Sequence, residues 1–248
     1  MVAGSSAAFD SQAAAYDRWY ATPLGQLTDR VEKEALFGIL PSVQGRLLLE
    51  VGCGTGNITL ALARRGARVV GLDASRPMLA AARRREREAP GVAGWLQGRA
   101  ESLPFPAHTF DGVLSALALD FMADRLGAVR EMVRVLRPGG FLAVAVLNRH
   151  SLWTLKRRGR AWLKASLWRG VHFLTPGGLL QLIWAGGDWE AVHLKPAVYF
   201  PPWGGALAVR GYARLERLAQ HLRLPGGAVV VAVARKKRVP FLSPGRRL

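Results

Sequence analysis

A buried strand that ends in a glycine-rich turn constrains this chain more than any other part of its sequence. Residues 46–51 form a short apolar run, and Gly52, Gly54 and Gly56 follow at every second position before a helix-like segment begins at Asn57. Strands that are apolar on both faces are typical of parallel sheets. Glycine lets the backbone turn sharply and lets a ligand approach without a Cβ in the way. The turn therefore predicts a ligand site at the carboxyl end of a parallel strand.

Two other glycine-rich turns fit this stretch less well. A dinucleotide-binding turn of the pattern G-x-G-x-x-G needs its third glycine at position 57, where the chain has Asn57. A P-loop needs a lysine directly after its last glycine, and no lysine follows here. The P-loop is therefore excluded, and a dinucleotide site is disfavoured.

An acidic residue ends the next apolar strand. Asp73 closes the segment 68–73 and follows the glycines by about 20 residues, the spacing at which a carboxylate meets the ribose hydroxyls of a nucleoside. An aspartate at a strand end is often the N-cap of the next helix instead, and Ser75 and Pro77 indicate that a helix does begin here. Together with the glycine turn, the spacing favours ribose binding.

Strand-like and helix-like segments alternate through much of the chain. We expect helices at residues 7–40, 57–65, 78–88, 126–136 and 177–184, and strands at 46–51, 68–73, 95–97, 110–115, 141–147, 190–195 and 228–234. Repeated β-α-β units predict a parallel sheet wrapped by helices, with ligands at the carboxyl ends of its strands. The pattern lapses at 149–176, a basic segment rich in Trp that we interpret as an insertion.

The charge of the chain is uneven. The net charge is +18, and residues 1–150 carry 18 basic and 14 acidic side chains whereas residues 151–248 carry 17 and 3. A concentrated basic surface favours an anionic partner or membrane. Only six of the 35 basic residues are lysines, so a general bias toward arginine also explains the charge without any partner. Both interpretations stay open.

Cysteine content and hydropathy bear on the compartment. Cys53 is the single cysteine, which excludes an internal disulfide and a zinc site built from several cysteines. Residues 1–10 lack the pattern of an export signal, and the longest apolar run, 141–147, is too short to span a membrane. We therefore expect a cytoplasmic protein without a metal, or one that is peripheral at the inner face of the membrane.

Five motifs occur in a characteristic order and spacing. They are Glu50-x-Gly52-x-Gly54-x-Gly56, Val69 to Asp73, Ala100-Glu101-Ser102-Leu103-Pro104-Phe105, Phe110-Asp111-Gly112-Val113 and Arg134-Val135-Leu136-Arg137-Pro138-Gly139-Gly140. Together they resemble class I S-adenosylmethionine-dependent methyltransferases of the type 11 group, strongly over residues 46–147 and more loosely outside them. The resemblance implies a Rossmann-like three-layer α/β/α sandwich, with a mostly parallel seven-stranded sheet and an antiparallel last strand, and S-adenosyl-L-methionine as the cofactor.

On this basis we divide the chain into five regions. They are an N-terminal helical lead-in at 1–45, a cofactor-binding core at 46–148, an inserted lid and acceptor region with the return to the sheet at 149–205, a C-terminal helix and last strand at 206–234, and a basic tail at 235–248.

The resemblance also implies a set of cofactor-binding residues. The set is Tyr16, Glu50, Gly52, Cys53, Gly54, Gly56, Asp73, Ala74, Met78, Ala100, Glu101 and Ser115. By the resemblance the turn packs against the methionine part, Asp73 binds the ribose, and Ser115 lies beside the sulfonium. Members commonly place an aspartate that accepts from the adenine amino group just before the Ala-Glu pair, but this chain has Arg99, which has no acceptor. Either another group accepts the hydrogen bond from the adenine amino group, or that hydrogen bond is absent.

Catalysis by such an enzyme needs little covalent help. A sulfonium methyl is already electrophilic, so the protein chiefly aligns the reactants and excludes water. A general base is required only if the acceptor must lose a proton. Asp120, His150 and His172 are weak candidates for that base, and each is more commonly a surface or packing residue.

Two absences narrow the acceptor. Residues 115–120 lack the Asn/Asp-Pro-Pro-Tyr pattern of enzymes that methylate exocyclic amines of nucleobases or glutamine. The single cysteine excludes the two-cysteine route to carbon-5 of pyrimidines. Methylation of these exocyclic amines is therefore disfavoured, and carbon-5 methylation by the two-cysteine route is excluded.

Residues 152–169 predict an amphipathic, cationic helix. One face carries Leu152, Leu155, Trp162, Leu163 and Leu167, and the other carries Arg157, Arg158, Arg160, Lys164 and Arg169. Three interpretations stay open: a lid whose apolar face packs over the active site, contact with an anionic membrane, and, less favoured, contact with a nucleic acid. The aromatic segment 199–205 favours an apolar acceptor pocket.

The sequence thus predicts a methyltransferase that acts on a small apolar acceptor such as a quinone-like compound, a lipid or another metabolite, at oxygen, nitrogen or carbon. The alternatives are an RNA-directed methyltransferase and a non-catalytic partner protein that binds the cofactor.

Overall fold

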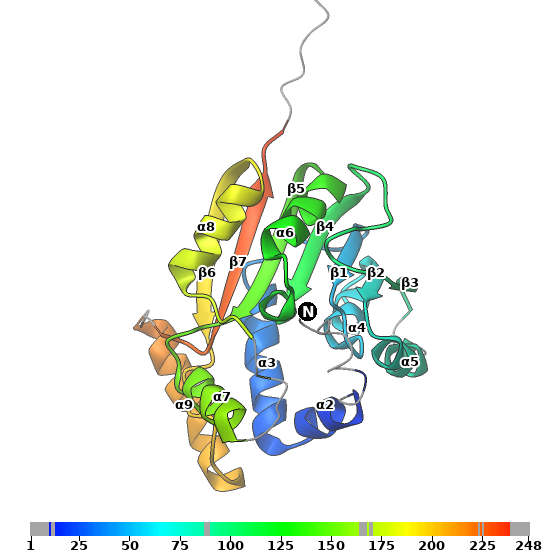
Figure 1. Cartoon of the computed structure of the whole chain (residues 1–248). Helices are drawn as coiled ribbons and strands as arrows, with labels where there is room; N and C mark the ends of the chain where they lie inside the picture. Colours follow the sequence, from blue (N-terminus) through cyan, green and yellow to red (C-terminus); the bar gives the residue numbers. More distant parts are fainter. Residues whose placement is uncertain are drawn as a thin grey trace, which may run out of the picture.

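The computed structural model describes residues 10, 13–86, 90–163, 168, 171–222, 224 and 226–238. In this part of the chain, seven strands form one sheet in the order β3-β2-β1-β4-β5-β7-β6 (Figure 1). Neighbouring strands are parallel, except that β7 is antiparallel to both β5 and β6. The prediction of a mostly parallel seven-stranded sheet with an antiparallel last strand is confirmed.

Most elements lie where the alternating pattern places them. The strands are β1 (Leu47–Val51), β2 (Arg68–Asp73), β3 (Val92–Gln97), β4 (Phe110–Ala116), β5 (Leu136–Leu147), β6 (Trp189–Ala197) and β7 (Val229–Lys236). The helices are α2 (Ala13–Tyr20), α3 (Pro23–Phe37), α4 (Asn57–Ala63), α5 (Arg76–Arg85), α6 (Arg125–Val135), α7 (Leu152–Leu163), α8 (Pro176–Gly186) and α9 (Ala206–His221), with a short 3-10 turn, η2 (Leu119–Phe121).

The expectation of one helix at residues 7–40 is wrong, because the described part of this segment forms two helices. Thr22 caps α3: its hydroxyl accepts from the backbone N–H of Gly25 at 3.0 Å. Pro23 occupies the first turn of α3, where its missing N–H leaves no bond unmade. The break lets α2 lie against α3 rather than continue it. Residues 7–9 lie outside the described residues.

Two apolar cores lie on the two faces of the sheet. One face packs against α6 and α8, which contribute Met132 and Ile183. The other packs against α3, α4 and α5, which contribute Val31, Leu62 and Leu79. These side chains are nearly inaccessible to water, and burying each is worth about 1.5–3 kcal/mol. The result is the expected three-layer arrangement.

The carboxyl ends of β1, β2 and β4 meet at one edge of the sheet. Glu50 pairs in register with Gly71 of β2 and Leu114 of β4. β1 leads into the glycine turn, and β2 ends at Asp73. Figure 1 shows α2, α3 and α7 gathered at this end of the molecule, which is the end where a parallel sheet is expected to bind its ligand.

Candidate functional site

A cavity lies between the glycine turn and the two lead-in helices. Its lining comes from α2 and α3, from the turn after β1, and from the ends of β4, β5 and β7; it comprises Tyr16, Tyr20, Glu32, Leu36, Glu50, Gly52, Cys53, Gly54, Asn57, Ile58, Ala116, Leu117, Ala145 and Val229. The volume is about 50 Å³. Five of the twelve residues predicted to bind the cofactor lie in this lining.

Only one of the three turn glycines faces open space. Gly52, Gly54 and Gly56 have φ angles of 76°, 54° and 82°, a region that favours glycine. A Cβ on Gly52 would collide with Ala118, and a Cβ on Gly56 would lie 2.6 Å from the ring of Trp95. A Cβ on Gly54 would meet no atom within 4 Å. Gly54 is therefore the position at which a ligand can lie against the backbone, whereas packing requires the other two glycines.

Asp73 is fixed at the rim of this turn. The backbone N–H groups of Gly54 and Ser75 donate to its two carboxylate oxygens at 2.8 and 2.9 Å. Each oxygen keeps a lone pair for a further donor such as a hydroxyl. Burial raises the pKa of Asp73, and these hydrogen bonds oppose the rise. The N-cap of α5 is Ser75, whose hydroxyl accepts from the N–H of Met78 at 3.4 Å, so Asp73 is free of that role.

The residues expected around the adenine follow Asp73 in the sequence. Met78 and Ala100 are buried, and the carbonyl of Ala74 accepts from the side chain of Gln97 at 3.1 Å. The guanidinium of Arg99 lies 3.5 Å from the carboxylate of Glu101, and its side chain is 66% exposed. Arg99, at the position where the resemblance leads us to expect an aspartate, thus pairs with Glu101.

Glu50 and Cys53 are both buried beside the turn. The hydroxyl of Thr59 donates to Glu50, and burial raises the pKa of Glu50 to about 8. Glu50 therefore joins the end of β1 to α4. Burial also raises the pKa of the Cys53 thiol, which keeps the thiol protonated and unreactive.

The lead-in helices are tied to the turn by polar contacts. The hydroxyl of Thr55 donates to Asp17 of α2 at 2.8 Å. The side chain of Asn57 donates to Asp29 of α3 at 2.5 Å and accepts from Lys33 at 2.8 Å. These contacts hold α2 and α3 over the mouth of the turn, where Tyr16 also lies.

Two polar residues of the cavity lining, Tyr20 and Glu32, were not predicted by the sequence analysis. The Tyr20 hydroxyl donates to Glu32 Oε2 at 3.5 Å. The Tyr16 hydroxyl donates to that of Tyr20 at 3.3 Å. Burial raises the pKa of Glu32 to about 8, while the nearby charge of Arg157 lowers it. Helical periodicity gave no signal for them, because it cannot tell which tertiary neighbour a polar helix residue meets.

Ser115 and Asp120 lie at the end of β4 and just after it, and both are buried. The Oδ2 atom of Asp120 accepts from the N–H of Leu147 at 2.9 Å, and burial raises the pKa of Asp120 to about 7. The other two candidate bases, His150 and His172, are exposed, and neither lines the cavity at the glycine turn. Of the three candidates, Asp120 alone has the burial of an active-site acid.

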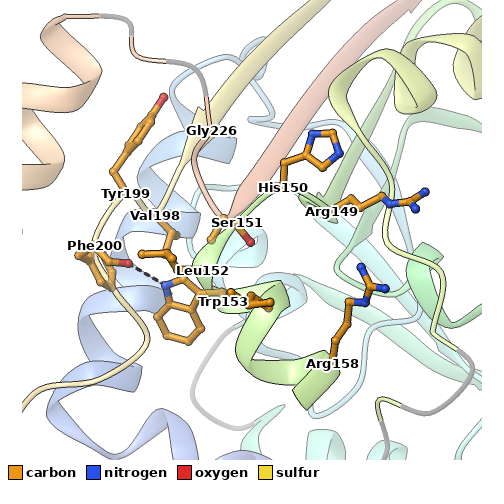
Figure 2. A pocket seen from close by; sticks show the side chains of 12 residues that line it. Arg149, His150, Ser151, Leu152, Trp153, Arg158, Val198, Tyr199, Phe200 and Gly226 are labelled. Carbon is orange, nitrogen blue, oxygen red and sulfur yellow. Dashed lines mark hydrogen bonds between the residues drawn. The ribbon is translucent and has the colours of Figure 1, made fainter. Parts of the chain in front are cut away.

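A larger pocket of about 390 Å³ lies elsewhere, between the start of α7 and the segment 198–200 (Figure 2). His150, Tyr199 and Phe200 line it, and the Trp153 indole donates to the carbonyl of Phe200 at 2.8 Å. Its lining contains no residue of the glycine turn. The larger pocket is therefore separate from the cavity at the glycine turn, and it is the one that Tyr199 and Phe200 of the aromatic segment border.

α7 is rotated relative to the expected amphipathic arrangement. Leu152 and Leu155 are 53% and 67% exposed, whereas Trp153 is buried. The guanidinium of Arg157, expected in water, lies 5.3 and 4.7 Å from the rings of Trp153 and Trp168. A large indole with a hydrogen-bond partner takes the buried position in place of the leucines. The side chains of Trp162 and Leu163 and the residues 164–167 and 169 lie outside the described part.

Within the described ranges there is no group of three or more His, Cys, Asp or Glu residues that could hold a metal ion. None of the helices found there is both long and apolar enough to cross a membrane.

Known proteins are similar to this chain in sequence and in fold. The sequence model of a methyltransferase domain family matches residues 49–144. A 2-phytyl-1,4-naphtoquinone methyltransferase from Thermosynechococcus vestitus is 34% identical, over 75% of this chain and 93% of the relative. A ubiquinone biosynthesis O-methyltransferase from Cereibacter sphaeroides is 32% identical, over 67% and 70%. The crystal structure of a SAM-dependent methyltransferase from Thermotoga maritima, 23% identical, covers 94% of this chain and 100% of its own with a TM-score of 0.73, which shows the shared fold.

Proposed function

Because this chain belongs to the class I S-adenosylmethionine-dependent methyltransferases of the type 11 group, we propose that it methylates a small, largely apolar acceptor with a quinone-like ring. The observation that carries this proposal is the 34% identity to a naphthoquinone methyltransferase along nearly the whole of that protein. The similarity to a ubiquinone biosynthesis methyltransferase supports the same acceptor class. An aromatic cluster next to Arg157 also favours a planar ring: Trp168 lies 5.8 Å from Phe121 and 6.4 Å from Phe173 between ring centres.

The proposed cofactor site consists of the twelve residues of the sequence prediction, Tyr16, Glu50, Gly52, Cys53, Gly54, Gly56, Asp73, Ala74, Met78, Ala100, Glu101 and Ser115. The open space at Gly54 supports it, because that space would admit the methionine part against the backbone. The free lone pairs of Asp73 suit two ribose hydroxyls. Buried Met78 and Ala100 offer apolar surface to an adenine ring.

The chemistry of this reaction is an in-line displacement. The cofactor supplies a methyl group that is already activated on a positively charged sulfur. The residues of this chain bind, orient and exclude water, which together favour the reaction by proximity. α2 and α3 are tied to the turn through Thr55 and Asn57, and they line one side of the cavity.

The test is transfer of labelled methyl groups. The protein is incubated with methyl-labelled S-adenosylmethionine and a cell extract, which is then separated into lipid, water-soluble, RNA and protein fractions. We expect the label in the organic extract, in a product that migrates with aromatic ring compounds, and none with the variant Asp73→Ala. Label in the RNA fraction alone would instead support the RNA-directed alternative, and label in water-soluble products alone would contradict an apolar acceptor.

We also propose that the protein contacts an anionic membrane, through residues 152–169 together with α9. Eight of the ten exposed large apolar side chains in the described residues lie in or near these helices: Leu152, Leu155, Trp203, Leu207, Leu215, Leu218, Leu222 and Leu224. On α9 the exposed leucines run beside Arg210, Arg214 and Arg217, while the acidic Glu216 is buried. Apolar side chains flanked by arginines are typical of helices that lie in a membrane interface.

Vesicle sedimentation tests this contact. The protein is expected to sediment with vesicles that contain phosphatidylglycerol and to remain in solution with phosphatidylcholine alone. Leu218→Asp should reduce sedimentation strongly, whereas Gln181→Asp, at an exposed position of α8, should not. Equal sedimentation of both variants and the parent protein would contradict the contact.

A further inference from the structure

Buried polar atoms without hydrogen-bond partners occur at and just after the end of β4 and on the helices α6 and α7. Four such side-chain atoms occur in the described residues, namely Ser115 Oγ, Asp120 Oδ1, Arg125 Nε and Arg157 Nη1. Ser115 and Asp120 are each only 1% exposed. A buried polar atom left unpaired costs about 1–3 kcal/mol. The fold thus holds several atoms at a cost that a bound polar molecule would remove.

Arg157 is held in place without being neutralised. Trp153 and Trp168 hold its guanidinium by cation–π contacts. Glu32 and Asp120 are near enough for their charges to raise the pKa of Arg157, which burial lowers. No ion pair within 4.0 Å joins Arg157 to either carboxylate, although all three residues are described. The buried Nη1 atom of Arg157 has no hydrogen-bond partner among the described residues, so it can donate to an acceptor atom of a bound molecule.

Glu32 is the carboxylate of this group that lines the cavity. It lines the same cavity as Gly54 and accepts a hydrogen bond from Tyr20, which in turn accepts from Tyr16. The remaining charges near it are Asp29 and Lys33 on its own helix, which are paired to each other at 2.7 Å. Glu32 therefore has a free carboxylate oxygen next to the place proposed for the cofactor's methionine part.

We propose that Glu32, Tyr20 and Arg157 form the subsite for the reacting group of the acceptor, and that this group is the hydroxyl of a phenol or a reduced quinone. This proposal rests on the proposed function, and it selects methylation at oxygen. The acceptor oxygen forms a bond to the methyl carbon while the carbon–sulfur bond breaks and leaves its electron pair on sulfur. The hydroxyl proton passes to the carboxylate of Glu32.

The charges of the subsite favour oxygen over nitrogen. An N–H of Arg157 needs an acceptor, and a hydroxyl oxygen that becomes negative as it loses its proton supplies one. An amine nitrogen becomes positive as it is methylated, so Arg157 would oppose its reaction. Glu32 accepts a proton only in its ionised form. The pKa of Glu32, about 8, places that form at slightly alkaline pH.

Two matched ring compounds test the subsite, 2-naphthol and 2-naphthylamine. Their binding is measured by calorimetry at a pH above 8, with the protein saturated with S-adenosylhomocysteine. We expect 2-naphthol to bind more tightly than 2-naphthylamine. Glu32→Gln, Tyr20→Phe and Arg157→Gln should each weaken 2-naphthol about 10- to 100-fold, with little effect on 2-naphthylamine. Glu34→Gln and Arg160→Gln, at exposed positions of the same two helices, should change neither.

Affinity for S-adenosylhomocysteine, measured on every variant, separates this proposal from the proposed function. If the parent protein does not bind it, the proposed function fails. If every variant binds it, but 2-naphthol does not bind or is unaffected by the three substitutions, the subsite is refuted while the cofactor site stands. A variant that fails to fold would also lose its affinity for S-adenosylhomocysteine. The 2-naphthol affinities of the two remaining variants then test the subsite. A second readout is the rate of methylation of 2-naphthol, whose increase with pH up to about 8 should disappear in Glu32→Gln.

Discussion

Replacing Gly54 by alanine should weaken cofactor binding while costing little stability. The φ angle of Gly54 is +54°, and a residue with a Cβ pays about 1–2 kcal/mol in that region. No atom lies within 4 Å of the new Cβ, so no collision adds to this cost. For a chain of this size the melting temperature should fall by about 2–8 °C. The methyl group would occupy space proposed for the cofactor, and affinity should fall about tenfold or more.

Gly56→Ala is the matched comparison, because it should cost more stability than Gly54→Ala and weaken cofactor binding less. Its φ of +82° carries the same backbone cost, and its Cβ would lie 2.6 Å from the Trp95 ring and 3.3 Å from the Ala82 Cβ. Overpacking typically adds about 1–3 kcal/mol, for a total of about 2–5 kcal/mol. Urea unfolding measures stability, and calorimetric titration with S-adenosylmethionine measures affinity. Unchanged affinity in Gly54→Ala, or equal loss of stability in both variants, would refute the assignment of separate roles.

Three further predictions concern the site and the core. Asp73→Asn cannot accept from both the Gly54 N–H and two hydroxyls, and should weaken the cofactor about 10- to 100-fold in the same titration; equal affinity would argue against ribose binding. Because the pKa of Glu50 is raised to about 8, the folded protein keeps a proton that the unfolded chain loses, so stability should fall between about pH 4.5 and 8. Glu50→Gln should make that slope shallower by up to about 1.4 kcal/mol per pH unit in urea unfolding, and an unchanged slope would contradict it. Gly112→Ala places a Cβ against Phe141 and should destabilise by about 1–3 kcal/mol, with partial rescue of the melting temperature by adding Phe141→Leu; failure of the rescue would locate the strain elsewhere.

Local patterns in the sequence were enough to predict the sheet. Apolar runs bounded by glycine and charged residues identify strands, and β2 lies at the residues expected for it. β5 is longer than expected, because Leu136 pairs with Phe110 and extends the strand backward through Pro138 and two glycines. That pairing is a tertiary contact and leaves no mark on local periodicity. The break at Thr22 does have a local signal, a capping residue before a proline, but the helical spacing of apolar residues continues on both sides of it and hides that signal.

The part of the candidate site formed by neighbouring chain segments could be predicted from the sequence. The part formed by segments far apart in the sequence could not. The glycine turn and Asp73 are joined by one hydrogen bond, and sequence spacing alone placed them together. Glu32 and Arg157 lie on helices far apart in the sequence, so nothing in either helix indicates the other. A helical wheel also assumes that apolar residues are buried together. The indole of Trp153 is buried while Leu152 and Leu155 are exposed. The guanidinium of Arg157 lies over the Trp153 ring and is therefore on the buried side of α7.

The position of β7 has a consequence for how the chain reaches its native state. β6 precedes β7 in the sequence, yet it joins the sheet only through β7, which lies between it and β5. During synthesis, β6 therefore has no partner until β7 emerges, and β5 keeps an unpaired edge of Val and Ala that other chains can join. Removing β7 would detach β6 as well instead of trimming the sheet by one strand. Completion of the sheet, and closure of the cavity wall to which Val229 contributes, thus come late in folding.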